Sequence, residues 1–295
     1  MRILVILTGG TIASAEKGGV ISPSVSPLER LLCFYSERHG FDLEFESVSP
    51  YTVLSEDLSA EYLNRLAECA AGAVGKGYEK IMICHGTDTL QYSAAALSYL
   101  LAGKNCCAVL VSAGKPLDAP DSNGFDNFCA AAEFLKYTDL HGTFVSYKNN
   151  CENAKILSGT GLELHREADD SLHSIRNTYA AEYDGGQIAF NAEFSAEEIM
   201  NVPQGARFTE YSDIQTVCAV PGERYTLCPA GTKAVILRPY HSGTLNTQSK
   251  AFCRFCSDAK RRNIPVFAVN IRPGAQYESS SRFEELGIVP LENAA

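Results

Sequence analysis

The chain has 295 residues, of which 45% are hydrophobic and 20% are charged, as is ordinary for a soluble globular protein with one large or two modest domains. Its net charge of −10 opposes broad binding to nucleic acid or to an anionic membrane, and no apolar run approaches the roughly 20 residues of a membrane span. The 11 cysteines are scattered and odd in number, which indicates reduced thiols and a cytoplasmic protein.

Short apolar runs alternate with amphipathic runs of helical period through the first 148 residues. The predicted strands are 3–7, 43–48, 81–84, 108–111 and 143–145. The predicted helices between them are 27–38, 60–75, 88–101 and 123–135. Because strands that alternate with helices are joined by right-handed crossovers, this order predicts an α/β fold with a doubly wound, mostly parallel sheet.

The pattern becomes polar and mixed after residue 148, where only a short strand at 154–157 is expected. Alternation resumes with runs at 214–220, 234–237, 247–260 and 266–269. We therefore expect a larger N-terminal catalytic domain over 1–193, a linker over 194–212 and a smaller C-terminal α/β domain over 213–295. The tail opens a helix without completing it, so either the chain is truncated or this domain lacks a closing helix.

The first motif that carries chemistry is Thr8-Gly9-Gly10-Thr11, directly after the first predicted strand. Paired glycines allow a sharp turn and a close approach of ligand, and Thr11 then lies at the sheet edge where α/β proteins bind ligands. A helix-capping threonine is the simpler interpretation. A dinucleotide-binding G-x-G-x-x-G is incomplete because Ala13 and Ser14 follow, and the P-loop sequence G-K-S/T is absent.

The second motif is His85-Gly86-Thr87-Asp88-Thr89, after the third predicted strand. Thr87 or Asp88 could cap the following helix, but a cap needs only one such residue. A carboxylate beside a hydroxyl can instead hold a substrate ammonium while the hydroxyl acts on a carbonyl. Since both motifs follow strands of one predicted parallel sheet, they indicate nucleophilic attack on a carbonyl at its edge.

Together the two motifs resemble those of the bacterial-type L-asparaginase family, which includes amidohydrolases and the archaeal tRNA-amidotransferase glutaminase subunit. The segment 54–58 is similar to the family's substrate-binding pair, and 112–127 is similar to its G-x-x-P…S-D-G…N segment. The resemblance spans essentially the whole chain and is strongest over 1–130. It implies hydrolysis of the side-chain amide of L-asparagine to aspartate and ammonia, with some glutaminase activity and with no metal or organic cofactor.

The resemblance assigns catalytic roles by position. Thr11 is similar to the nucleophile that forms a β-acyl-enzyme, and Thr87 to the second threonine, which activates the nucleophile or the attacking water. Asp88 is similar to the carboxylate that binds the substrate α-amino group. A covalent intermediate of this kind divides a difficult amide cleavage into two easier steps.

The resemblance also assigns substrate contacts. Ser55 and Glu56 are similar to the clamp on the α-carboxylate and amino group, and a glutamate at this position is typical of members that also accept glutamine. Backbone N–H groups near Gly10 and Gly86 are expected to stabilise the oxyanion.

Two departures from the family's pattern bear on activity. The loop over 15–23 has no tyrosine, and Val20 lies near the position where the family often has one. This loop keeps the Lys17-Gly18-Gly19 hinge expected of a lid. The family's activating lysine is also missing, since Glu163, Leu164 or His165 falls at its position.

Lys148, Lys155 or His165 could substitute for the missing lysine, although each is also explained as an ordinary surface or packing residue. Without such an activator the chain could instead be a degenerate member that binds an amino acid or a partner with little turnover. A glutaminase subunit of a transamidation complex is a further alternative, opposed by the absence of the N-terminal extension that such subunits usually carry.

The expected partners are a small amino-acid substrate and further copies of the chain, with no nucleic acid and no membrane. In the family the site is completed by a neighbouring subunit, so the resemblance implies a homodimer or homotetramer to which Tyr277, Glu278 or Ser279 contributes. Cys253 and Cys256 form a lone C-x-x-C inside a helical pattern, which does not indicate a zinc site without a second pair of ligands.

Overall fold

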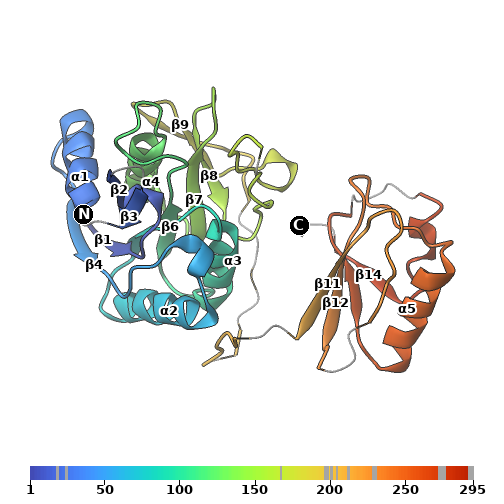
Figure 1. Ribbon diagram of the computed structural model, residues 1–295. Coiled ribbons are helices and arrows are strands. Elements are labelled where there is room, and N and C mark those ends of the chain that lie inside the picture. Colours follow the sequence, from blue (N-terminus) through green and yellow to red (C-terminus); the bar gives the residue numbers. More distant parts are fainter. Residues whose placement is uncertain are drawn as a thin grey trace. The chain divides into compact units, whose positions relative to one another are not determined.

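The computed structural model describes residues 1–17, 20–23, 26–166, 168–195, 199, 202–203, 205–210, 213–227, 231–271 and 277–291. The chain divides into two compact units, Met1–Glu210 (unit 1) and Tyr211–Ala295 (unit 2), each with its own sheet (Figure 1). Across the described ranges, no helix combines the length and hydrophobicity that crossing a membrane requires.

Unit 1 contains an eight-stranded sheet with the order β10-β9-β8-β7-β6-β5-β1-β4. Its parallel strands are β1 (Arg2–Leu7), β4 (Glu44–Val48), β5 (Lys80–Cys84), β6 (Cys107–Val111) and β7 (Gly142–Lys148). Its antiparallel strands are β8 (Ala154–Ser158), β9 (Ala181–Tyr183) and β10 (Ile188–Phe190). The predicted α/β class with a mostly parallel sheet is confirmed.

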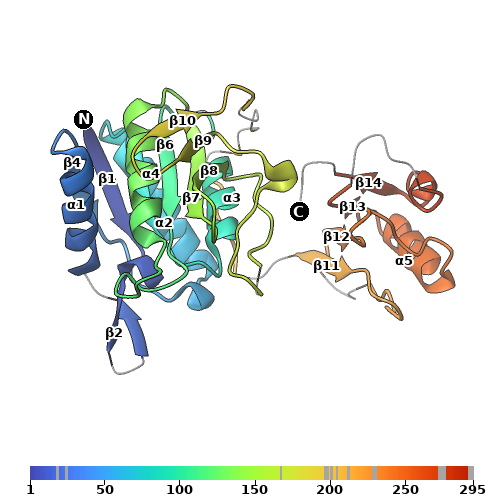
Figure 2. The ribbon, with the colours of Figure 1, turned by 90° about the horizontal axis from the view of Figure 1, so that it is seen from above.

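Helices cover both faces of this sheet, with α1 (Ser26–His39) and α4 (Gly124–Tyr137) on one face and α2 (Ala60–Gly75) and α3 (Leu90–Leu100) on the other (Figure 2). The alternation of β1 explains this arrangement. Ile3 and Val5 join the core cluster of α1 and α4, while Leu4 and Ile6 join that of α2 and α3. A strand buried on both faces reads as a continuous apolar run, which is why the sequence predicted it.

Several elements of unit 1 are absent from the sequence prediction. The antiparallel hairpin of β2 (Ser14–Lys17) and β3 (Val20–Pro23) follows the first motif. Strands β9 and β10 have three residues each, too few to show a period. The Asn64 side chain donates to Phe208 O and accepts from Phe208 N, both at 2.9 Å, so part of the expected linker lies against α2.

Unit 2 contains a four-stranded parallel sheet with the order β11-β12-β13-β14. Its strands are β11 (Ile214–Cys218), β12 (Ala234–Arg238), β13 (Val266–Ala268) and β14 (Ile288–Pro290). Helix α5 (Lys250–Arg261) is capped by Ser249 Oγ, which accepts from Phe252 N, and it buries Phe252 and Phe255 in the core of this unit. The closing helix questioned by the sequence falls on residues 292–295, outside the described residues.

Candidate active site

Three loops meet at the carboxyl edge of the unit 1 sheet because β1 lies between β4 and β5 with all three strands parallel. The Thr8 hydroxyl donates to Cys84 O at 2.8 Å, which ties the loop after β1 to the end of β5. Val53 N donates to Thr8 O at 3.0 Å, which ties the same loop to the one after β4. These hydrogen bonds join the three loops at the edge of the sheet where α/β proteins bind ligands.

Glycines 10 and 86 allow these loops to touch. A Cβ on Gly10 would lie 2.3 Å from Gly86 N, and the φ of +80° at Gly10 already disfavours any other residue. A Cβ on Gly86 would lie 2.4 Å from the Cβ of Ser55. Three of the residues singled out from the sequence, Gly10, Ser55 and Gly86, are thus brought into direct contact.

Thr11 and Thr87 directly follow the two glycines, so both threonines lie where these loops pack together. Thr11 begins a short 3₁₀ turn (Thr11–Ala13), and Thr87 precedes helix α3. Both residues are half-buried. Among the residues that the structure describes, neither hydroxyl has a hydrogen-bond partner.

Ser55 links the substrate-binding positions. Its backbone carbonyl accepts a hydrogen bond from the Thr89 hydroxyl at 3.0 Å, and its own hydroxyl donates to Asp88 Oδ2. Ser55 is buried, whereas Asp88 and Glu56 are exposed. Ser55 is thus paired with Asp88. The Glu56 carboxylate forms no ion pair with the described part of the chain.

His85 holds the Gly86 loop through hydrogen bonds of both ring nitrogens. Its Nδ1 lies 2.9 Å from Gly86 O, and because a carbonyl can only accept, Nδ1 carries the proton. Its Nε2 then accepts from the buried Ser93 hydroxyl at 2.8 Å. Burial lowers the pKa of His85, which keeps the imidazole neutral. With both nitrogens engaged, His85 holds the Gly86 loop in position and has no nitrogen left to act as a base.

The structure distinguishes the three groups that could replace the missing lysine. Lys148 Nζ is paired with Asp126 Oδ2 at 2.6 Å and Lys155 Nζ with Glu152 Oε2 at 2.8 Å, which accounts for both lysines as structural ion pairs. His165 is different, because it lies with Asp170 next to the loop that follows β6.

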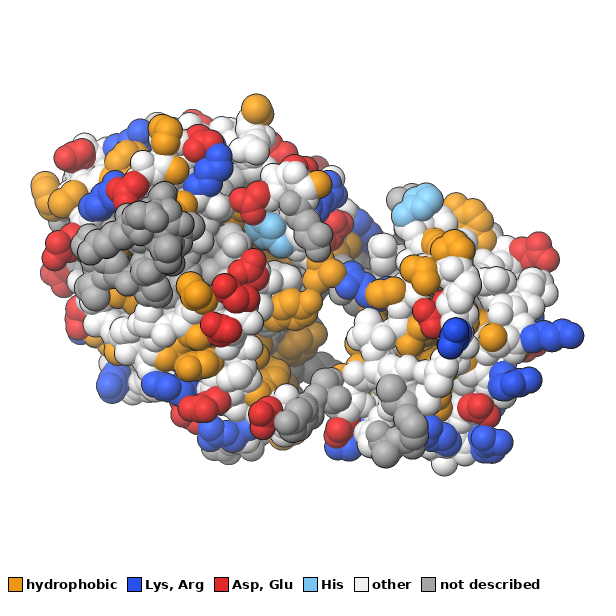
Figure 3. Space-filling view, in the orientation of Figure 1, with side chains coloured by type: hydrophobic (Ala, Val, Ile, Leu, Met, Phe, Trp, Pro, Cys, Tyr) orange, Lys and Arg blue, Asp and Glu red, His pale blue; other side chains and the backbone are white. Residues whose placement is uncertain are grey.

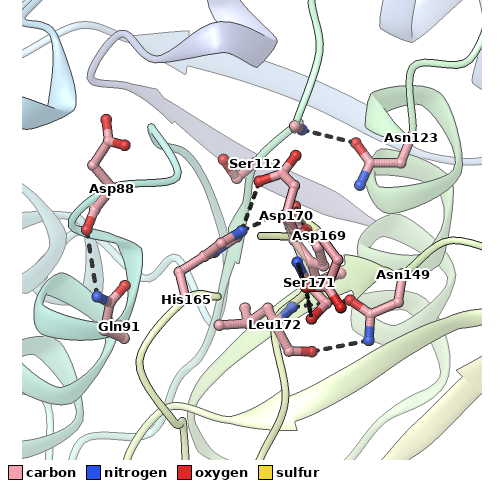
Figure 4. Close-up of polar contacts among 12 residues, drawn as sticks. Asp88, Gln91, Ser112, Asn123, Asn149, His165, Asp169, Asp170, Ser171 and Leu172 are labelled. Carbon is pink, nitrogen blue, oxygen red and sulfur yellow. Dashed lines mark hydrogen bonds and ion pairs between the residues drawn. The ribbon is translucent and has the colours of Figure 1, made fainter. Parts of the chain in front are cut away.

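His165 and Asp170 form a close pair that the sequence did not indicate (Figure 4). His165 Nε2 lies 2.8 Å from Asp170 Oδ1, and Tyr147 Oη donates to Asp170 O at 3.0 Å. Asp170 fills the space that a Cβ on Gly114 would take, with Oδ2 only 2.0 Å from that point. The His165 side chain is only 12% exposed, and its buried Nδ1 has no hydrogen-bond partner in the described residues.

Asn123 fixes the loop on which this pair rests. Its Oδ1 accepts from Gly114 N at 2.9 Å (Figure 4), and its Nδ2 donates to Lys148 O at 2.9 Å, which joins the loop after β6 to the end of β7. Of the expected lid, Gly18 and Gly19 lie outside the described residues, while β2 and β3 on either side are paired. In the described ranges, no group of three or more His, Cys, Asp or Glu side chains could hold a metal ion.

A family model described as "Asparaginase, N-terminal" matches residues 2–196. Among curated proteins, a glutamyl-tRNA(Gln) amidotransferase subunit from Saccharolobus islandicus is 28% identical over 181 residues, which are 60% of this chain and 40% of the relative. The corresponding protein of Metallosphaera sedula is 27% identical over 184 residues, or 60% and 41% of the two chains. The chain thus spans about two fifths of the length of these relatives.

Solved structures with the same fold cover nearly the whole chain. The thermostable L-asparaginase from Thermococcus kodakarensis superimposes with a TM-score of 0.75 at 22% identity, covering 98% of this chain and 88% of the other. L-asparaginase I from Vibrio cholerae gives a TM-score of 0.76 at 20% identity, with 100% and 89% covered. At these identities the likeness establishes the fold.

Proposed function

Because the chain belongs to the asparaginase family, we propose that it hydrolyses the side-chain amide of L-asparagine through an ester on Thr11. The observation that carries this proposal is the direct contact of Gly10, Gly86 and Ser55. That contact supports a single substrate site between Thr11, Thr87 and Asp88. Glutamine is the second substrate to test, since Glu56 is exposed beside the site.

The reaction divides into two transfers of one acyl group. Thr11 Oγ1 attacks the amide carbon, the C–N bond breaks, and the hydroxyl proton passes to the departing ammonia. A water molecule then attacks the Thr11 ester, which releases aspartate and returns a proton to Thr11 Oγ1. Backbone N–H groups of the Gly10 and Gly86 loops are expected to stabilise the oxyanion of both steps.

Substrate orientation follows from charge. The Asp88 carboxylate is exposed and suits the α-ammonium group of an amino acid, while the Ser55 hydroxyl that now donates to Asp88 can turn to the α-carboxylate. Glu56 adds a second negative charge for the ammonium. Holding both ends of the amino acid presents its amide in a fixed geometry to the nucleophile.

For the missing proton acceptor we infer His165, oriented by Asp170. Its Nε2 paired with Asp170 and its position beside the loop after β6 support this role, whereas both nitrogens of His85 are engaged in hydrogen bonds. Positioned general-base catalysis is typically worth about 10²–10⁴-fold. His165→Gln should therefore lower kcat by this order. His173→Gln, which changes a histidine of the same loop, should leave kcat unchanged.

The decisive experiment for the proposal is ammonia release from L-asparagine by the purified chain. Thr11→Ala should abolish release, by about 10⁴-fold or more, and acid quenching of the wild type should trap an acyl adduct on Thr11 by mass spectrometry. Thr52→Ala, at an exposed threonine in the loop after β4, is the matched control. A wild-type chain that binds aspartate but releases no ammonia would instead identify a binding protein without turnover.

The curated relatives favour a second candidate, a glutaminase subunit that delivers ammonia within an amidotransferase complex. Such a subunit is expected to be slow alone with both amides and to be stimulated by its partner and an acceptor substrate. Steady turnover of asparagine by the isolated chain, at a rate that a partner does not increase, would rule out this role. We further propose a homodimer or homotetramer, which light scattering on the purified chain would measure.

A further inference from the structure

Charged residues are unevenly divided between the two units. Residues 211–295 contain 10 Lys and Arg against 7 Asp and Glu, whereas residues 1–210 contain 15 against 28. Unit 1 therefore carries all of the excess negative charge, and unit 2 alone is basic. The net charge of the whole chain opposes anionic ligands, but the field at the surface of unit 2 does not.

The positive charge of unit 2 gathers beside a groove next to α5. Four arginine side chains line this groove, namely Arg224, Arg254, Arg261 and Arg262. The groove has a volume of about 340 Å³, within the range of roughly 300–1,000 Å³ that is typical of small-molecule sites. Figure 3 shows blue side chains along the side of unit 2 on which α5 lies in Figure 1.

The helical period explains why these charges share one stripe. Positions 254, 258, 261 and 262 lie on the solvent side of α5, because Phe252 and Phe255 occupy the core side. Asp258 Oδ1 accepts from Arg261 at 3.0 Å, which neutralises one guanidinium. Arg224 and Arg254 are exposed and form no ion pair with the residues that the structure describes. Their charges remain available for a ligand.

Part of the groove is lined by apolar side chains. Tyr225, only 7% exposed, packs on the ring of Phe255 with a centroid separation of 6.2 Å, and Leu227 and Ala251 add to this apolar part of the lining. A guanidinium binds phosphate through two parallel hydrogen bonds, which suits a cationic rim beside such a lining. We propose that this groove binds a small organic phosphate of nucleotide size, whose phosphate groups contact Arg224 and Arg254.

A small ligand fits these features better than a nucleic-acid strand does. Strand binding uses an extended basic track with aromatic side chains exposed for stacking. Here the aromatic side chains of the lining are buried and the arginines surround one concavity. The ligand therefore belongs to the class of mononucleotides or comparable phosphates.

Calorimetric titration of the full chain with ADP tests the proposal, with pyrophosphate and adenosine as separate arms. ADP should bind in a saturable manner, pyrophosphate more weakly, and adenosine weakest. The double variant Arg224→Ala/Arg254→Ala should weaken ADP binding about tenfold or more, while circular dichroism shows an unchanged fold. Lys233→Ala removes a positive charge of unit 2 outside the groove and should leave the affinity unchanged.

Three results would overturn the proposal. The first is an absence of ADP binding. The second is equal weakening by the double variant and by Lys233→Ala, which would indicate diffuse electrostatics. The third is binding of a single-stranded RNA oligonucleotide without binding of ADP, which would identify a nucleic-acid surface. None of these readouts depends on amide hydrolysis, so they are separate from the tests of Thr11.

Discussion

Replacing Gly86 by alanine tests whether the close contact between loops is what builds the site. The new Cβ would lie 2.4 Å from the Cβ of Ser55 and 2.5 Å from its Oγ, distances that real Cβ atoms do not adopt. Gly86 has no positive φ, so the perturbation is steric and acts on Ser55. The Ser55 side chain must move, and its hydrogen bond to Asp88 must break or rearrange.

The added methyl group has a cost both in stability and in activity. Forcing one methyl group into a packed contact typically costs about 1–3 kcal/mol, which for a unit of this size lowers Tm by several degrees. A displacement of about 1 Å at a site can reduce turnover by about 10²-fold. Gly86→Ala should therefore lower kcat/KM for L-asparagine by about 10²-fold. The free energy of unfolding should fall by only about 1–3 kcal/mol.

The matched control is Gly72→Ala, in α2, where an added Cβ meets nothing within 4 Å. This change should raise stability slightly, by up to about 1 kcal/mol from helix propensity, and should leave activity unchanged. Thermal unfolding and ammonia release measured on the same preparations separate the two effects. A Gly86→Ala variant with wild-type kcat/KM would refute the reasoning, because Ser55 could then move without consequence.

Three single residues of unit 1 can be tested by substitution. Asp88→Asn should raise KM for asparagine, because it removes the charged partner of the substrate ammonium. Since Asp88 is exposed, the change should have little effect on the free energy of unfolding. Burial lowers the folded-state pKa of His85, so the unfolded chain takes up its proton first as the pH falls. Stability should therefore decline below about pH 6.5, and His85→Gln should lessen this decline in unfolding titrations. Asn64→Ala removes both hydrogen bonds to Phe208 and should speed proteolytic cleavage near that residue, with amide hydrolysis unchanged.

The parts of the site that the sequence could predict are those coded by short segments. Strands β1 and β5 are continuous apolar runs, and each motif follows its strand directly. Because both strands are parallel neighbours, two motifs about 75 residues apart become adjacent without any further information. Ser55 follows from the same rule, since it comes after β4, the other neighbour of β1.

His165 shows what a local pattern cannot supply. Its segment has no strand or helix of its own, so neither a period nor a cap predicts where the side chain lies. Its position depends on Asp170, whose carboxylate needs the space left by Gly114, a residue more than fifty positions earlier in the chain. Such a fit between distant loops has no sequence signal. The sequence alone therefore left Glu163, Leu164 and His165 open as the residue at the position of the missing lysine, depending on a one-residue gap.

The net charge of the whole chain conceals the different charges of the two units. On the proposed function, asparagine enters as a neutral zwitterion and leaves as aspartate with one more negative charge. In the proposed site, Asp88 and Glu56 repel this added negative charge within the roughly 8 Å over which salt screens charges in the cell. The 28 acidic residues against 15 basic ones in unit 1 add to the repulsion. On the proposed function, the acidity of unit 1 therefore favours release of the anionic product, whereas the basic groove of unit 2 suits the anionic phosphate proposed above.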